Sequence, residues 1–320
     1  MRAALIAVTL SLAAPIAASE FFLGFPVDCT LGQTCHIQHL MDRDAGPGAR
    51  DFQCGNLTYD GHKGTDFALQ TLVDMQRGVN VLAAAAGTVA ATRDDMPDVE
   101  YDPAKDDLVS GKECGNGLVI RHPEGWETQY CHMKSGSVLV SPGDRVDRGT
   151  VLGQVGLSGK TTFPHLHLSL RKDGQKTDPF DVGGDGSCGA TAESIWSETP
   201  PYVPGGLILV GFADRMPRYD AVKAGQAAMK NMPRDAGALV LFGLAYGGHA
   251  GDQIELQVTG PEGAVISEKV TLTRNQAQFF RAAGKRVGVS GWPIGIYTGT
   301  VRIVRDAKEL DRQKVQMTIR

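Results

Sequence analysis

The chain has 320 residues, and 32 basic against 36 acidic side chains give a formal net charge of −4. Hydrophobic residues at 42% and charged residues at 21% are ordinary globular values, so the composition excludes a wholly disordered chain. The mild acidity and the lack of a run of Lys and Arg argue against a nucleic-acid binder. The length favours two domains, and 40 Gly with 16 Pro favour many short strands separated by turns.

Residues 1–19 have the layout of a secretory signal peptide. Arg2 gives a positive start, residues 3–18 are mostly apolar, and Ala17 and Ser19 are the small residues of a cleavage site after Ser19. A membrane anchor fits less well, because Pro15 interrupts the run and a span needs about 20 apolar residues. We therefore expect an exported protein, located in the periplasm, with no membrane span after cleavage.

Export places the cysteines in an oxidising compartment, where an even number favours disulfides. The chain has six, at Cys29, Cys35, Cys54, Cys114, Cys131 and Cys188. The sequence does not choose among the possible pairings, but Cys29 with Cys35 would close a short loop. Cys54 with Cys114 would tie the residues before the first motif to an inserted loop. Zinc binding by cysteine is a weaker alternative, because no CxxC pair is present.

Short apolar runs broken by Gly, Asp and Pro predict an antiparallel β domain in the first half of the chain. Its acidic stretch 94–114 has few apolar residues and is expected to be a solvated insertion loop. The predicted organisation is a signal peptide (1–19), an N-terminal loop segment (20–53), a first β domain (54–182), a Gly- and Pro-containing linker (183–205) and a second β domain (206–320).

The second β domain carries candidate strands at a spacing typical of an immunoglobulin-like β-sandwich. In one of them Ile254, Leu256 and Val258 alternate with polar residues, which is the pattern of a half-buried strand. His249 stands alone near glycines, so we predict no catalytic group there. The predicted fold class is all-β, with an antiparallel sheet domain followed by an immunoglobulin-like sandwich.

The segment 163–170 has the strongest functional pattern. Successive side chains of a strand point to opposite faces, so Leu166, Leu168 and Leu170 would share one face and enter a core. His165, His167 and Ser169 fall on the other face. Adjacent histidines add little to stability, but they can present imidazoles to a metal or a substrate. Two exposed surface histidines are the alternative interpretation.

Two further segments offer polar groups of the same kinds. In residues 61–69 Phe67 faces the core, so Asp66 faces away from it, and the flexible Gly64 lets His62 converge on Asp66. In residues 128–133 alternation places His132 with Tyr130 on one face and Cys131 on the other. Cys131 would then point away from the site, and a disulfide or a place in the core suits it better.

The combination of these side chains predicts a catalytic zinc site. Imidazole and carboxylate are ligands that zinc prefers, and a catalytic zinc keeps three protein ligands and one open position. One Asp with two His satisfies that requirement and leaves two other His for proton transfer. The chain has no G-x-S-x-G and no H-E-x-x-H, which argues against a serine hydrolase and against the helical zinc proteases.

These segments resemble the motifs of the lysostaphin-type (LytM-like) zinc metallopeptidases. The matching stretches are His62-Lys63-Gly64-Thr65-Asp66-Phe67, Tyr130-Cys131-His132 and Pro164-His165-Leu166-His167, with Ala84-Ala85-Ala86-Gly87-Thr88-Val89 and Gly115-Asn116-Gly117 in order between them. The resemblance covers about residues 54–182 and implies a LytM-like catalytic domain. It departs from the family at Cys131, where a small residue is usual, and at the long insertion 94–114.

The resemblance implies a role for each site residue. His62, Asp66 and His167 correspond to the ligands of one zinc ion, and His132 and His165 to the paired catalytic histidines. It further implies an endopeptidase that hydrolyses peptide cross-links of bacterial peptidoglycan, with stem peptides as its substrate. Which histidine is the general base and which bond is cut stay open.

Two alternatives to this function stay open. A catalytically inactive relative could bind the wall or activate another hydrolase, although all five positions are filled here. A zinc peptidase for a protein outside the wall is the other alternative. His122 is expected in a hairpin turn. His36 and His39 have the spacing of a helical pair, for which we do not predict a metal site.

Overall fold

The computed structural model describes residues 21–184, 188–189 and 193–320 and shows a mostly β chain. The predicted signal peptide, 1–19, lies outside the described residues. The helices are short: α1 (Leu72–Arg77), α2 (Tyr219–Ala224) and the 3₁₀ turns η1 (Pro103–Leu108) and η2 (Pro123–Gly125). None of the helices in the described part of the chain is long and apolar enough to cross a bilayer.

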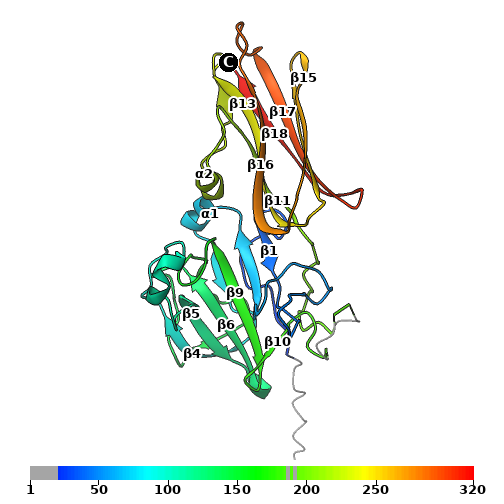
Figure 1. Ribbon diagram of the computed structural model, residues 1–320. Coiled ribbons are helices and arrows are strands. Elements are labelled where there is room, and N and C mark those ends of the chain that lie inside the picture. The colour runs from blue at the N-terminus through cyan, green and yellow to red at the C-terminus, as the bar shows by residue number, and fades with distance from the viewer. Residues whose placement is uncertain (1–20, 185–187, 190–192) are drawn as a thin grey trace, which may run out of the picture.

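An antiparallel sheet forms the first half of the molecule, below the upright C-terminal strands in Figure 1. Its order is β1-β2-β9-β6-β5-β4-β7, with β10 paired to β9, within the described residues. The strands are β1 (Cys35–His39), β2 (Thr65–Leu69), β4 (Gly87–Arg93), β5 (Asn116–Arg121), β6 (Trp126–Met133), β7 (Arg145–Val146), β9 (His165–Lys172) and β10 (Gln175–Thr177). A small second sheet pairs β3 (Asn80–Leu82) with β8 (Val151–Gln154).

Alternation along β9 and β2 divides the sheet into an apolar and a polar face. Leu166, Leu168 and Leu170 are buried in the core, as predicted, and so is Phe67 on β2. Burying these side chains is the main stabilising contribution of this sheet, at roughly 2 kcal/mol for each large apolar residue. The opposite face is left to the polar residues between them, and this places the candidate site.

The N-terminal segment 20–53, predicted to be loop, contributes the edge strand β1. Its side chains are buried, and it pairs with β2 in an antiparallel ladder. Sequence reasoning missed it because a five-residue strand that begins at a disulfide cysteine has too few residues to show a period.

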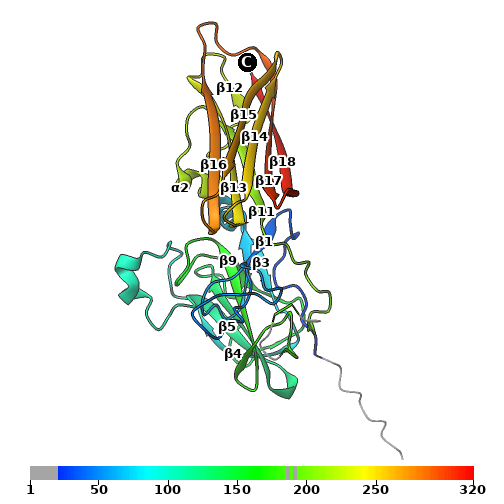
Figure 2. The ribbon, with the colours of Figure 1, turned by 45° about the vertical axis from the view of Figure 1, so that its right-hand side comes forward.

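The acidic insertion 94–114 is fastened by its own carboxylates. Asp94 accepts hydrogen bonds from the backbone N–H groups of Gly136 and Val138, and Asp98 does so from Ser135 and Leu157. Beyond these anchors the teal turn η1 stands away from the sheet in Figure 2. Part of this acidity therefore stabilises loops, and the rest is exposed, as expected for a solvated insertion.

Two further sheets, antiparallel except for β12, make up the C-terminal part. The first has the order β11-β13-β16 and the second the order β12-β18-β17-β14-β15, in which β12 joins parallel to β18. The strands are β11 (Gly206–Ala213), β12 (Asn231–Met232), β13 (Ala238–Gly248), β14 (Gln253–Gly260), β15 (Gly263–Thr271), β16 (Gln276–Arg286), β17 (Gly295–Arg305) and β18 (Lys308–Ile319). Six of them overlap candidate strands of the sequence, at 207–210, 238–246, 253–259, 265–272, 295–304 and 314–319. The strand β12 was missed because it has only two residues, and β16 because its apolar residues, among them the adjacent Phe279 and Phe280, do not alternate with polar ones.

The strand β13 is apolar on both sides because both of its faces are covered. Leu239 and Leu241 belong to the core between the two C-terminal sheets, where Gly299 of β17 approaches Leu241 closely. Phe242 and Tyr246 belong to the core that continues into the first half of the molecule. A strand covered on both faces reads as a continuous apolar run. The immunoglobulin-like topology and the boundaries of the domains remain predictions.

The structure gives the disulfide pairing, which the sequence left open. Cys29 bonds Cys35, as the short loop suggested. The considered bond between Cys54 and Cys114 does not form: Cys54 bonds Cys188, and Cys114 bonds Cys131. Cys114 lies two residues before β5, which pairs with β6, so the ladder brings it to Cys131. Cys188 instead lies after the first sheet and returns to the loop before β2.

Candidate metal centre

The three segments singled out in the sequence meet on the polar face of the first sheet. Asp66 on β2 lies directly opposite His167 on the neighbouring strand β9, and His62 precedes β2 by three residues. His165 starts β9, and His132 lies at the end of β6. The structure thus brings all five predicted site residues together, although they are up to 105 residues apart in the chain.

Three of these side chains converge most closely. Oδ1 of Asp66 lies 3.1 Å from Nε2 of His62 and 2.8 Å from Nδ1 of His167. The two imidazole nitrogens are 3.2 Å apart. Because all three residues are more than four-fifths buried, water has little access to the space between these atoms.

Each imidazole has its proton fixed on the far side of its ring. Nδ1 of His62 is 2.7 Å from the carbonyl oxygen of Leu40, which can only accept, so the proton is on Nδ1. Ser169 donates its hydroxyl hydrogen to the carbonyl of Lys63 and therefore accepts from Nε2 of His167. The lone pairs of Nε2 in His62 and Nδ1 in His167 consequently face Asp66.

This arrangement fits a metal ion. Two imidazole lone pairs and an ionised carboxylate oxygen are three acceptors with no donor among them, and buried acceptors without a partner are costly. A divalent cation would satisfy all three, and these atoms form a cluster whose separations suit a single ion. Fixing a ligand histidine through its other nitrogen is the usual outer-shell arrangement of zinc sites.

The remaining two histidines stand side by side next to this cluster. The rings of His132 and His165 are 4.6 Å apart between centroids, and Nε2 of His165 is 3.4 Å from Oδ1 of Asp66. Nδ1 of His132 donates to the carbonyl of Ser158, and Nδ1 of His165 donates to that of Phe163. In the neutral form of either ring, Nε2 is therefore the nitrogen that carries the lone pair.

Burial and neighbouring charges set the protonation states of the metal-free site. Burial would raise the pKa of Asp66, but the nearby His62 and His165 hold that pKa well below its ordinary value. Burial would lower the pKa of His62, but Asp66 raises it. Burial lowers the pKa of His132 well below its ordinary value, and His165 and His167 add to this effect. At neutral pH His132 is therefore uncharged and able to accept a proton.

The prediction that Cys131 points away from the site is wrong. Cys131 lies directly opposite His167 across the β6–β9 pair, and opposed residues share a face of the sheet. Tyr130 is the residue that enters the core, where its hydroxyl accepts from the N–H of Ala84. His132 has a positive φ of 62°, which breaks the alternation and returns its side chain to the site.

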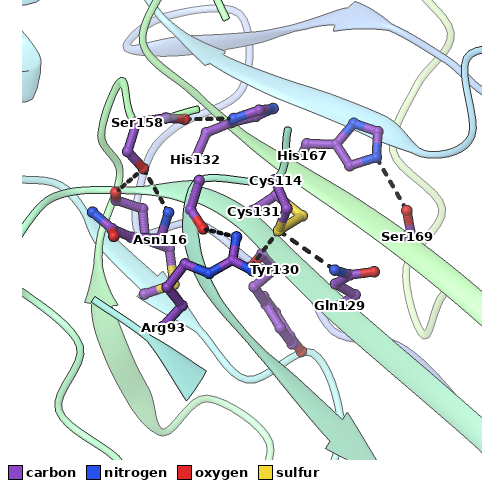
Figure 3. The surroundings of a disulfide bond; sticks show 12 residues. Arg93, Cys114, Asn116, Gln129, Tyr130, Cys131, His132, Ser158, His167 and Ser169 are labelled. Carbon is purple, nitrogen blue, oxygen red and sulfur yellow. Dashed lines mark hydrogen bonds between the residues drawn. A yellow bond between two sulfur atoms is a disulfide. The ribbon is translucent and has the colours of Figure 1, made fainter. Parts of the chain in front are cut away.

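The disulfide between Cys114 and Cys131 is part of the wall of the site. Figure 3 shows it between Gln129 and His132, with His167 and Ser169 on the neighbouring strand. The backbone N–H of His132 donates to the carbonyl of Cys114 at 2.8 Å. The cross-link therefore holds the left-handed backbone that His132 requires.

Sequence reasoning missed one contact of the site. His36 and His39 have the spacing of a helical pair, but both lie on strand β1. Nδ1 of His39 is 3.2 Å from Oδ2 of Asp66. The spacing of His36 and His39 does not predict this contact, because the contact depends on the register in which β1 pairs with β2. His122, also outside the cluster, is held by the carbonyl of Ala86 and the hydroxyl of Thr128.

Comparison with known proteins identifies the family of this arrangement. Residues 60–179, which contain all five predicted site residues, match peptidase family M23. This part of the chain belongs to family M23. The M23 domain includes β2 to β10, and the family of zinc peptidases agrees with the acceptor cluster. The resemblance to the lysostaphin-type peptidases is thereby confirmed.

Several curated proteins that match parts of the chain have names that include endopeptidase. A 68-residue stretch is 41% identical to the DD-carboxypeptidase/endopeptidase Mpg of Neisseria meningitidis, which covers 21% of this chain and 15% of that protein. A 109-residue stretch is 33% identical to the peptidoglycan DD-endopeptidase ShyA of Vibrio cholerae and covers 34% of this chain and 20% of that protein. The chain thus spans no more than about a fifth of the length of these two relatives.

Among solved structures, the chain is similar to a zinc containing peptidase from Vibrio cholerae. The sequences are 25% identical, and the match covers 49% of this chain and 39% of that chain. The TM-score is 0.34, so the overall similarity is weak.

Proposed function

We propose that this protein is an exported zinc metalloendopeptidase that hydrolyses peptide cross-links of bacterial peptidoglycan. The observation that carries the proposal is the convergence of three buried acceptors, His62 Nε2, Asp66 Oδ1 and His167 Nδ1, beside two further imidazoles. The M23 family match and the names of the curated relatives support the same reaction. Because those relatives are named DD-endopeptidases, we propose a DD cross-link as the bond.

The three acceptors would be the ligands of one zinc ion, with the fourth position open. A zinc ion held there supplies Lewis-acid chemistry, which polarises a peptide carbonyl and acidifies water. The residues around it keep the ligand nitrogens unprotonated without competing for them, through the carbonyl of Leu40 and the hydroxyl of Ser169.

His132 and His165 would move the protons. Because Nδ1 of each ring donates to a carbonyl, the neutral ring carries its lone pair on Nε2, which could accept the proton that the attacking water loses as its oxygen bonds to the peptide carbon. The imidazolium formed can donate a hydrogen bond to the developing oxyanion. When the carbon–nitrogen bond breaks, the proton passes to the leaving amine.

The location and the C-terminal fold belong to the same proposal. The three disulfides, formed by all six cysteines of the chain, are typical of an oxidising compartment and support the periplasm. The two C-terminal sheets bury apolar faces against each other, which supports an immunoglobulin-like sandwich. All five site positions are filled, which argues against an inactive wall-binding relative.

The test is the digestion of purified peptidoglycan sacculi by residues 20–320, with released muropeptides measured by mass spectrometry. We expect DD-cross-linked dimers to become monomers and LD-cross-linked dimers to persist. A chelator and His132→Ala should each abolish the change, whereas His249→Ala, a histidine outside the site, should not. An unchanged profile from a zinc-loaded chain would indicate a substrate outside the wall. A chain that neither binds zinc nor cleaves would overturn the proposal.

A further inference from the structure

His39 contacts the candidate metal centre from outside the M23 match. Its Nδ1 is 3.2 Å from Oδ2 of Asp66, whereas Oδ1 of the same carboxylate faces His62 and His167. We propose that His39 is a positioning residue, which donates a hydrogen bond to Oδ2 of Asp66 and thereby holds Oδ1 toward the metal. This inference rests on the proposed zinc site and adds an outer-shell residue to it.

The direction of the hydrogen bond follows from the acceptor. A carboxylate that ligates a metal is ionised, so it can only accept, and the proton must be on Nδ1 of His39. The ring of His39 is buried, with 8% of the residue exposed, and packs edge-on against the ring of Tyr59 at 5.2 Å between centroids. Packing therefore restricts the ring to an orientation in which Nδ1 meets the carboxylate.

A β-bulge in strand β1 places His39 beside Asp66. Along β1 and β2, Ile37 pairs with Phe67, but the next pair is His39 with Asp66, so Gln38 is an extra residue. In a regular ladder Gln38 would lie opposite Asp66 instead. Bulges of this kind next to active sites commonly redirect a side chain. The bulge thus places the imidazole of His39, and not the amide of Gln38, beside the proposed ligand Asp66.

The displaced Gln38 anchors the strand to the C-terminal sheets. Its amide nitrogen donates to the carbonyl of Ala277 at 2.8 Å, and its amide oxygen accepts from Gln278 at 3.0 Å. Three residues earlier the disulfide of Cys35 fixes the start of the strand. His39 is therefore held by a strand that is fastened at both ends, and this rigidity is what a positioning residue requires.

The expected consequence is tighter metal binding. A carboxylate fixed at one oxygen presents the other to the metal without first losing rotational freedom. Removing outer-shell partners of this kind typically weakens metal affinity about 10- to 100-fold. Because His39 does not itself ligate, its loss should change affinity and leave the number of bound ions unchanged.

The experiment measures zinc affinity of residues 20–320 by competition with a chromophoric chelator. His39→Leu removes the donor, and His39→Phe removes it while keeping a ring to pack against Tyr59. His39→Asn keeps a donor near the position of Nδ1. The matched control is His36→Leu, a buried histidine on the same strand that bonds Gln38 and not a ligand. Circular dichroism of each metal-free variant checks folding, and absorption of the cobalt-substituted protein reports the ligand geometry.

We expect His39→Leu and His39→Phe to bind zinc about 10- to 100-fold more weakly and to alter the cobalt spectrum. His39→Asn should stay within about threefold of the wild type, and His36→Leu should match it. Wild-type affinity in both donor-free variants would overturn the inference and leave the proposed function intact. Equal losses in His39→Leu and His36→Leu, or no rescue by Asn, would reduce His39 to a structural residue. A wild-type chain without zinc affinity would overturn the proposed function itself, and this inference with it.

Discussion

Two buried aspartates, one in each half of the molecule, show how a functional site differs from a structural one. In the C-terminal part, Asp252 accepts from Nε and Nη2 of Arg305 at 2.9 and 2.8 Å and from the N–H of His249. The negative charge of Asp252 is thus paired with the positive charge of Arg305. Asp66 in the first sheet faces two imidazole nitrogens whose protons are fixed elsewhere. Buried hydrogen-bond acceptors that lack a donor indicate a site for a ligand. Buried acceptors that are paired with a donor stabilise the fold.

The largest expected effect comes from Asp66→Ala. The change removes one of three proposed ligands, and about a third of a binding free energy near 12 kcal/mol corresponds to a loss of affinity on the order of 1,000-fold. Zinc competition with a chelator measures it, and muropeptide release should vanish in parallel. A variant that keeps its zinc and its activity would contradict the proposed ligand set.

The same substitution at the other aspartate should affect stability alone. Asp252→Ala leaves Arg305 without its carboxylate, and breaking a buried ion pair lowers the free energy of unfolding by about 3 kcal/mol. Urea unfolding gives this value, and zinc affinity should equal that of the wild type. A large loss of zinc affinity in Asp252→Ala would show that the two halves are not independent in this respect.

A smaller effect is expected where a neutral hydroxyl fixes a ligand histidine. Ser169→Ala removes the acceptor that keeps the proton of His167 on Nε2, so zinc affinity should fall about 10- to 100-fold. Ser169→Thr retains the hydroxyl and should recover most of the affinity in the same chelator competition. If Ala and Thr give the same affinity, the hydroxyl does not set the protonation of His167.

The smallest effect concerns His36, a buried histidine whose side chain bonds Gln38 rather than Asp66 or Asp252. Burial lowers the pKa of His36 from 6.5 to about 4, so the unfolded chain binds its proton more readily than the folded chain does. Stability from this group is complete above pH 6.5 and is lost as the pH falls from 6.5 toward 4. Between pH 7 and pH 5 the loss is about 2 kcal/mol. Urea unfolding at both pH values should show this slope reduced in His36→Leu, and an unaltered slope would contradict the assigned pKa.

The parts of the site that the sequence predicted are those that depend on local alternation. On β9 the apolar and polar residues separate cleanly, so Leu168 and His167 could be assigned to opposite faces before the strand was seen. The motif around His62 and Asp66 was found for a similar reason, because Phe67 marks which side is core. These assignments need only the two-residue period of a strand.

The parts that were missed depend on irregular backbone or on long-range pairing. The positive φ of His132 reversed the expected faces of β6, and the bulge in β1 brought His39 to Asp66. Neither the positive φ nor the bulge can be recognised from the amino-acid composition. The Cys54–Cys188 bond joins residues 134 apart, and no local pattern reports which cysteine the fold brings near another.

The most direct test of the zinc site is a crystal structure of the zinc-loaded chain with anomalous data at the zinc edge. We predict one strong peak at about 2.0 to 2.2 Å from Nε2 of His62, Oδ1 of Asp66 and Nδ1 of His167, with His39 still bonded to Oδ2. A peak held by His132 and His165 instead, or no peak in this cluster, would contradict the proposal that these three acceptors form the metal centre.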